Sequence, residues 1–242
     1  MILVIPMAGS GQRFKDAGFT TLKPFIDVSG QWMVEWALKS FDLKKVRKII
    51  FLVRKDHDAE VGAVKKLKEK YGKQCECITV NGPTEGAACT ALIAKEYLNT
   101  DEDIIIKDSD GYIISDIHLA IEKQLRGVSG ILSTVSLLEG NNYSFARVDN
   151  RGYVAEVAER KRISDNVIAG LYYFTHGSDF VKYAEQMIKK DKRVNGEFYI
   201  APVFQEMIED DKKVIIDPVK ALWNLGTPEG LTYFLKNYKG GA

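Results

Sequence analysis

The first 24 residues constrain this chain more than any other segment. The apolar run Ile2-Leu3-Val4-Ile5 leads into the turn Gly9-Ser10-Gly11, and the cations Arg13 and Lys23 follow. A buried strand that ends in a turn of small residues lets backbone N–H groups approach a bulky anion. The glycines alone are equally typical of a plain tight turn. Because arginine binds phosphate oxygens as a fork and lysine as a point charge, the combination predicts a polyphosphate site. It is not a P-loop, since no Gly-Lys-Ser/Thr follows the second glycine.

Charge and cysteine usage narrow the class of protein. With 34 basic and 33 acidic residues the net charge is +1, so no overall field attracts nucleic acid or an anionic membrane. The chain lacks the pattern of a signal peptide, and no apolar run approaches the roughly 20 residues of a membrane helix. Three cysteines are too few for a disulfide framework. We expect one cytoplasmic domain over residues 1–242, with no nucleic-acid or membrane partner.

Strand and helix patterns alternate through the first half of the chain. This alternation predicts a Rossmann-like, three-layer α/β/α fold with a mainly parallel sheet. Helices are expected between the strands, including a lysine-rich one over residues 60–71 and one over residues 84–97 with Thr84 as its cap. In such sheets ligands bind beyond the carboxyl ends of the strands, where both the glycine turn and Asp110 lie. The predicted strands cover residues 2–5, 49–53, 76–80 and 103–106.

The pattern becomes rich in short strands after residue 128. We interpret residues 129–242 as a smaller β-rich lobe with closing elements that holds a second substrate, and residues 1–128 as the nucleotide-binding core. A final helix is expected from Pro228, which suits the first helical position. The other predicted elements are strands at residues 130–138, 145–149, 153–159, 167–174 and 214–216 and helices at residues 178–190 and 199–209.

The residues from Met7 to Phe14, together with Lys23-Pro24, resemble the signature of the sugar-1-phosphate nucleotidyltransferases, also called nucleotide-sugar pyrophosphorylases. The resemblance implies that Ala8, Gly9 and Gly11 wrap the nucleotide. It further implies that Arg13 and Lys23 neutralise the phosphates and act in catalysis.

Later segments extend this resemblance almost to the end of the chain. Glu85-Gly86 looks like the family's segment that reads the base and ribose, and Asp110 stands where the family has a catalytic aspartate that binds Mg²⁺. Asn224 occupies the position of a second metal-binding aspartate, and an amide oxygen is the weaker ligand for magnesium. The positions that the resemblance implies for the acceptor are Ala146, Glu159, Lys161, Gly170 and Glu197.

The sequence therefore predicts an enzyme that transfers a nucleoside monophosphate from a nucleoside triphosphate to a phosphorylated acceptor, with Mg²⁺ as cofactor. A sugar 1-phosphate is the expected acceptor, which gives a nucleotide sugar and pyrophosphate. Asp108-Ser109-Asp110 also matches the Asp-x-Asp element of metal-dependent glycosyltransferases, and Asn224 is compatible with a weakened, nucleotide-binding regulator. The base, the acceptor and the formation of a homo-oligomer stay open. We expect His57, His118 and His176 to be surface or capping residues.

Overall fold

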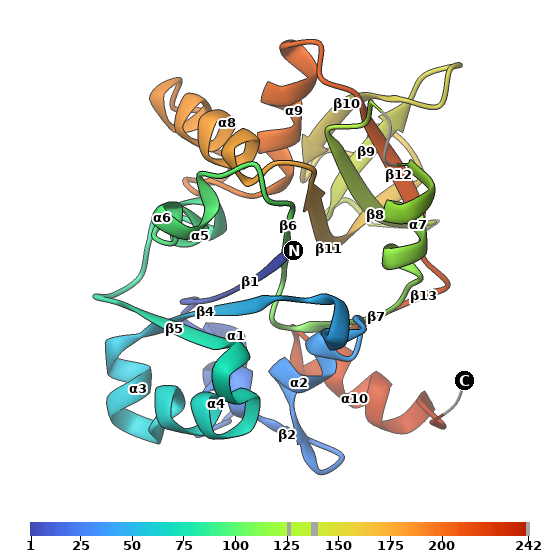
Figure 1. Cartoon of the computed structure of the whole chain (residues 1–242). Helices are drawn as coiled ribbons and strands as arrows, with labels where there is room; N and C mark the ends of the chain where they lie inside the picture. Colours follow the sequence, from blue (N-terminus) through green and yellow to red (C-terminus); the bar gives the residue numbers. More distant parts are fainter. Residues whose placement is uncertain (125–126, 137–139, 241–242) are drawn as a thin grey trace.

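The computed structural model describes residues 1–124, 127–136 and 140–240, and one mixed β-sheet forms its centre (Figure 1). Within these residues the sheet has nine strands, in the order β10-β9-β11-β6-β1-β4-β5, with β8 beside β11 and β12 beside β8. β1 lies parallel to β4 and β6, and β4 lies parallel to β5. These strands confirm the four predicted for the first half. They are β1 (Ile2–Met7), β4 (Lys48–Arg54), β5 (Cys75–Val80) and β6 (Ile104–Lys107).

The side chains of β1 alternate between two cores, because successive residues of a strand point to opposite faces. Ile2 and Val4 join the core beneath α5, α6, α8 and α9, whereas Leu3 and Ile5 join the core beneath α2, α4 and α7. Each of the four is at most 1% exposed, and burying such a side chain contributes about 1.5–3 kcal/mol. The expected three-layer α/β/α arrangement is confirmed. The covering helices are α2 (Met33–Leu38), α4 (Ala63–Tyr71), α5 (Ala87–Leu92), α6 (Lys95–Leu98), α7 (Ile117–Gln124), α8 (Gly177–Lys189) and α9 (Ala201–Glu209).

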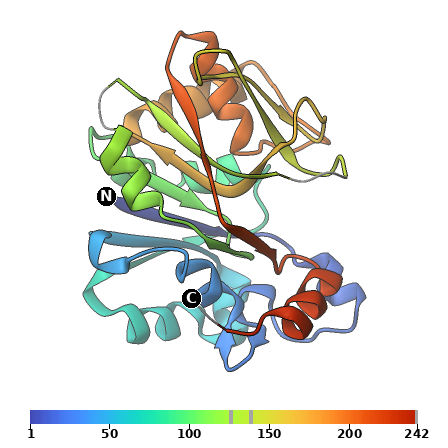
Figure 2. The same ribbon diagram turned by 90° about the vertical axis from the view of Figure 1, so that its right-hand side faces the viewer.

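β11 joins the two halves of the molecule. It runs antiparallel to β6, with Leu171 opposite Lys107 and Phe174 opposite Ile104. The strands of the expected β-rich lobe therefore continue the central sheet, and Figure 2 shows them on one side of the molecule with the blue and cyan first half on the other. Predicted strand residues 137 and 138 and the last residues of the lobe, 241–242, lie outside the described part of the chain. The strands are β8 (Gly130–Ser136), β9 (Ser144–Val148), β10 (Val154–Glu159), β11 (Asn166–Phe174) and β12 (Val214–Pro218).

A small ribbon and an aromatic cluster bring the two ends of the chain together. β7 pairs antiparallel with β13, which places Asn224 opposite Gly111, the residue after Asp110. Trp36 packs edge-to-face on Phe234 with ring centroids 4.9 Å apart, in a cluster that also includes Phe14. This packing fixes the glycine-rich segment relative to the carboxyl-terminal turn. The elements involved are α1 (Gln12–Asp16), β7 (Gly111–Ile114), β13 (Ala221–Asn224) and α10 (Pro228–Asn237).

Residues 84–97 do not form the single helix that we expected. Gly86 precedes α5, and α6 begins at Lys95. The backbone carbonyl of Glu85 accepts from the N–H of Phe198 at 2.8 Å, and the N–H of Ala88 donates to the carbonyl of Phe198 at 3.0 Å. This long-range pairing holds the segment before α5 extended, so Thr84 is not a helix cap.

Two further expectations for the first half are corrected. The lysine-rich segment forms two helices, α3 (Lys55–Val61) and α4, because Gly62 takes a left-handed φ of 63° between them. His57 is not a surface residue but lies in α3 with 4% of its surface exposed. Its position near a predicted helix boundary gave no signal that this side chain would be buried.

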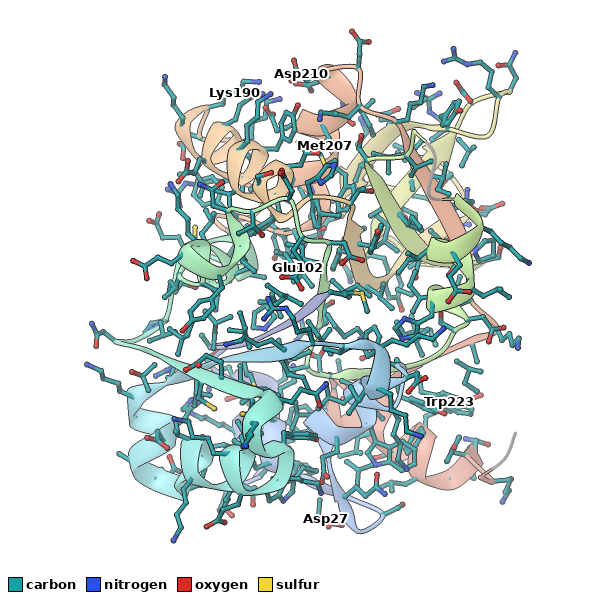
Figure 3. All side chains as sticks on the ribbon, viewed as in Figure 1. Asp27, Glu102, Lys190, Met207, Asp210 and Trp223 are labelled. Atoms are coloured by element: carbon teal, nitrogen blue, oxygen red, sulfur yellow. The ribbon has the colours of Figure 1, made fainter. Side chains whose placement is uncertain are left out.

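The remaining side chains follow the expected division between interior and surface. Figure 3 shows Met207 among packed side chains, whereas Lys190 and Asp210 project at the edge. Among the described residues, none of the helices has the length and apolar character needed to cross a membrane. The short elements are η1 (Lys23–Phe25), β2 (Asp27–Val28), β3 (Gln31–Trp32), η2 (Leu43–Lys45) and η3 (Gly72–Gln74).

Candidate active site

A cleft of about 540 Å³ opens beyond the carboxyl ends of β1 and β6. It contains most of the residues proposed from the sequence, from both halves of the chain. Glu85, Ala146, Lys161 and Gly170 are not in its lining. The predicted residues that line it are Ala8, Gly9, Gly11, Arg13, Lys23, Gly86, Asp110, Glu159, Glu197 and Asn224.

The glycine turn is held by the helix that follows it. Gly11 adopts a left-handed φ of 66° and precedes α1, whose Phe14 is buried and anchors the helix. Arg13 is exposed and lines the cleft. Lys23 begins η1, and its ammonium group forms an ion pair with the carboxylate of Asp110. The structure thus joins the amino-terminal cations to the end of β6, as the sequence argument required.

Two carboxylates follow β6 and differ in their protonation. Burial and the neighbouring Asp110 raise the pKa of Asp108 to about 7. Burial also opposes ionisation of Asp110, but Lys23 and Lys107 outweigh it and lower the pKa of that carboxyl group. Different environments thus separate the titration of two adjacent acids. Asp110 is therefore the more fully ionised member of the pair at neutral pH.

Lys107 is a feature that the sequence analysis missed. Its side chain is fully buried, and its ammonium group donates to the backbone carbonyl of Asp108 at 3.0 Å. Burial lowers the pKa of Lys107, whereas Asp108 and Asp110 act in the opposite direction. A lysine that ends an apolar run looks like the solvent-exposed end of a strand, so the sequence gave no reason to bury it.

The residues near Gly226 fit a magnesium ion. A Cβ atom at Gly226 would lie 2.5 Å from Oδ2 of Asp110 and 3.1 Å from Oδ1 of Asn224, so both oxygens converge on the same space. The Asn224 oxygen also accepts from the N–H of Gly226 at 2.8 Å. Mg²⁺ takes one or two protein oxygens together with substrate phosphates. The described residues contain no cluster of three or more His, Cys, Asp or Glu able to hold a metal.

The segment predicted to read the base presents its backbone, rather than a charged side chain, to the cleft. Gly86 lines the cleft, and a Cβ at this position would overlap the backbone of Phe198. The Glu85 side chain is exposed and pairs with Arg193 at 2.5 Å instead. Thr84 and Thr90, which the sequence analysis did not select, also line the cleft. Their hydroxyl groups hydrogen-bond to each other and to the Gly86 carbonyl.

The acceptor side of the cleft differs in detail from the resemblance. Glu159 lines the cleft, accepts from Ser144, and has its pKa raised by burial. Arg160 also lines the cleft, and its guanidinium group donates to the Tyr199 hydroxyl at 3.1 Å. Lys161, the residue selected from the sequence, is exposed and outside the lining.

Two other predicted acceptor residues lie elsewhere. Ala146 is fully buried, and its backbone carbonyl accepts from Ser164 at 2.7 Å. Gly170 adjoins the carboxylate of Asp108 and lines a second cavity of about 580 Å³, which shares Asp108, Asp110 and Asn224 with the cleft. The walls of this cavity include the aromatic rings of Trp223 and Tyr233. The site residues thus extend into two adjoining spaces.

Comparisons with known proteins show the family and the fold of this chain. The model of the nucleotidyl transferase family matches residues 2–239. The solved nucleoside-diphosphate-sugar pyrophosphorylase from Vibrio cholerae is 26% identical, with a TM-score of 0.83 over 97% of this chain and 100% of that chain. A solved putative glucose-1-phosphate thymidylyltransferase from Bacillus anthracis shares the fold, at 16% identity and a TM-score of 0.80 over 100% of this chain and 98% of that chain.

A curated relative matches most of this chain. The bifunctional protein GlmU from Thermotoga maritima is 24% identical over 206 residues, which are 83% of this chain. The chain spans only 43% of that protein's length. The family model, by contrast, matches this chain almost from end to end. The chain belongs to the nucleotidyl transferase family.

Proposed function

We propose that this chain joins a nucleoside monophosphate, taken from a nucleoside triphosphate, to a sugar 1-phosphate, and releases pyrophosphate. The observation that carries the proposal is the meeting of Lys23 and Asp110 in one cleft with the glycine turn and the acceptor-side residues. The pyrophosphorylase from Vibrio cholerae, which covers nearly the same length, supports the same reaction class. The product would enter nucleotide-sugar and polysaccharide biosynthesis.

The reaction needs no protein nucleophile. A phosphate oxygen of the acceptor attacks the α-phosphorus, the bond to the bridging oxygen of the β-phosphate breaks, and pyrophosphate leaves. Catalysis then depends on positioning and on neutralisation of charge. Arg13 and Lys23 supply positive charge beside the glycine turn, which lines the cleft and whose N–H groups would contact phosphate oxygens. Asp110 and Asn224 would hold Mg²⁺, which supplies further charge neutralisation when it is bound.

The acceptor side supplies groups of matching chemistry. Arg160 offers a guanidinium fork for the acceptor phosphate, and Glu159 and Glu197 offer carboxylates for sugar hydroxyl groups. We place Arg160 on the phosphate because it lines the cleft and is fixed by Tyr199.

Cys75, Cys77 and Cys89 are free thiols, which supports a reducing cytoplasm as the location.

The decisive experiment combines the four nucleoside triphosphates with several sugar 1-phosphates and other phosphorylated acceptors in the presence of Mg²⁺. Pyrophosphate release that depends on one triphosphate and one acceptor is expected, and Asp110→Asn is the matched inactive control. If none of the combinations releases pyrophosphate, the proposal is contradicted. Consumption of a finished nucleotide sugar without pyrophosphate would favour the glycosyltransferase alternative, and nucleotide binding without turnover would favour a regulator.

A further inference from the structure

A small pocket of about 50 Å³ adjoins the nucleotide side of the cleft. Gly9, Ser10, Gly11 and Lys23 line both spaces, so the glycine turn forms part of the wall of the pocket and of the cleft. A single water needs about 10–15 Å³ of such space. The pocket is therefore large enough for a few waters or for one phosphoryl group, and too small for a sugar or a base.

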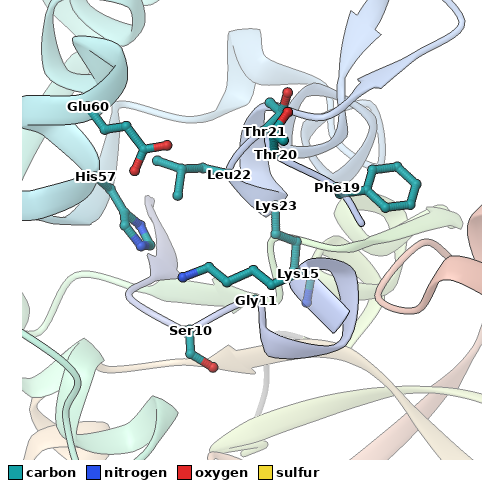
Figure 4. Close-up of a pocket in the computed structure, with 11 residues that line it drawn as sticks. Ser10, Gly11, Lys15, Phe19, Thr20, Thr21, Leu22, Lys23, His57 and Glu60 are labelled. Carbon is teal, nitrogen blue, oxygen red and sulfur yellow. The ribbon is translucent and has the colours of Figure 1, made fainter. Parts of the chain in front are cut away.

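The wall opposite the glycine turn contains a polar atom without a partner. His57 is 4% exposed, and its Nε2 atom is buried and has no hydrogen-bond partner among the described residues. Figure 4 shows the imidazole ring in the pocket, with the Lys15 side chain extended toward it. Buried polar groups are nearly always hydrogen-bonded, so an unpartnered one in a pocket wall marks a position where a polar ligand or an ordered water can bind.

Lys15 supplies an unpaired positive charge to the pocket. It lines the pocket and forms no ion pair within the described part of the chain, whereas the ammonium group of Lys23, which also lines the pocket, is paired with Asp110. Burial, together with Arg54 and Lys15, lowers the pKa of His57, while Asp56 and Glu60 act in the opposite direction. The ring is thus neutral at pH 7 and carries one N–H that can donate. The Glu60 carboxylate also lines the pocket, and because Glu60 and Lys15 are both exposed, solvent screens both charges.

We propose that this pocket receives the terminal phosphate of the nucleoside triphosphate and, after transfer, the distal end of pyrophosphate. The inference rests on the proposed function. With the base side of the cleft at Gly86 and the α-phosphate near Asp110, the phosphate chain continues along the glycine turn past Lys23. His57 donates its Nε2 proton to a phosphate oxygen, and Lys15 neutralises the charge.

Pyrophosphate itself is the probe that tests this pocket. His57→Phe keeps a ring of similar size and removes the donor, and Lys15→Met removes an exposed charge. Each is expected to weaken calorimetric binding of magnesium pyrophosphate about tenfold, and binding of the triphosphate similarly, while binding of the nucleoside monophosphate stays unchanged. His57→Gln, which places an amide donor near the same point, should recover part of the loss. His118→Phe is the matched control, because His118 accepts from the backbone N–H of Asp42 and is not in the pocket wall.

The outcomes separate this inference from the function on which it rests. The pocket assignment is overturned if His57→Phe and Lys15→Met bind pyrophosphate as tightly as the wild type does. This holds even when the wild type is an active enzyme. Equal losses for monophosphate and pyrophosphate would also overturn it, since they indicate a general disturbance of the cleft. Should His57→Phe fail to fold, Lys15→Met decides the question alone. Absence of pyrophosphate release by the wild type contradicts the proposed function instead.

Discussion

The ammonium group of Lys23 is bound to the carboxylate of Asp110, which joins the glycine-rich segment to the end of β6 across the cleft. Lys23 lies in η1 and Asp110 directly after the central strands, 87 residues apart in the chain. The lysine pairs with the carboxylate that, on the proposed function, would hold Mg²⁺. On that proposal nucleotide and metal exchange partners with this pair, as Lys23 moves to phosphate and Asp110 to the metal.

Lys23→Met should reveal this exchange. Loss of the cation is expected to lower kcat by about 10²-fold or more, because preorganised charge on the transferring phosphate is removed. The same change frees Asp110, so Mg²⁺ should bind the nucleotide-free variant more tightly than it binds the wild type. A metal titration by calorimetry measures the second effect. Weaker or equal binding of Mg²⁺ would show that Lys23 does not compete for Asp110.

Asn224→Asp should alter the dependence on magnesium. A second carboxylate next to Asp110 provides a stronger ligand than an amide oxygen, so half-maximal activity is expected at an Mg²⁺ concentration about tenfold lower. The control Asn150→Asp adds the same charge in the turn between β9 and β10. An unchanged magnesium titration in Asn224→Asp would remove Asn224 from the metal site.

Glu102 makes the stability of the fold sensitive to acid. The Arg47 guanidinium group, with a further contribution from the amino group of Met1, lowers the pKa of Glu102 to about 2 although partial burial opposes it. A carboxyl group whose pKa is lower in the folded chain than in the unfolded chain stabilises the fold at pH values above its unfolded pKa. This stabilisation is lost as the pH falls toward 2.

Glu102→Gln is therefore expected to reduce the free energy of unfolding at pH 7 by about 1 kcal/mol after allowance for solvent screening. The difference from the wild type should shrink between pH 4.5 and pH 2. Chemical denaturation at several pH values measures this difference in the free energy of unfolding. The control is Glu122→Gln, because Glu122 forms an exposed ion pair with Lys45. A difference that stays constant down to pH 2 would contradict the assignment.

The sequence was most informative where local pattern and long-range structure agree. Unbroken apolar runs such as the one at Ile2 can only be strands covered on both faces, and the glycine turn and Asp110 had to lie at the same edge of the sheet. Sequence patterns failed where distant segments impose the local structure. Phe198 holds Glu85 extended, and His57 is buried by packing that its own helix does not encode.

The acceptor side shows the same limit at the level of single residues. β10 ends at Glu159, and Arg160 then takes a left-handed φ of 54°. Strand periodicity therefore cannot tell which of the two following cations turns inward. The resemblance selected Lys161, whereas the structure places Arg160 in the cleft wall and leaves Lys161 exposed.

Arg160→Ala and Lys161→Ala form a matched pair that tests which cation binds the acceptor. Because the Arg160 guanidinium group lines the cleft and is oriented by Tyr199, its removal is expected to raise KM for the acceptor phosphate about tenfold or more, with KM for the triphosphate little changed. A charge-assisted hydrogen bond contributes about 1.5–3 kcal/mol, which agrees with that factor. Lys161→Ala should change either KM by less than about twofold. The reverse pattern in steady-state kinetics would restore Lys161 as the acceptor residue and would require the end of β10 to turn on binding.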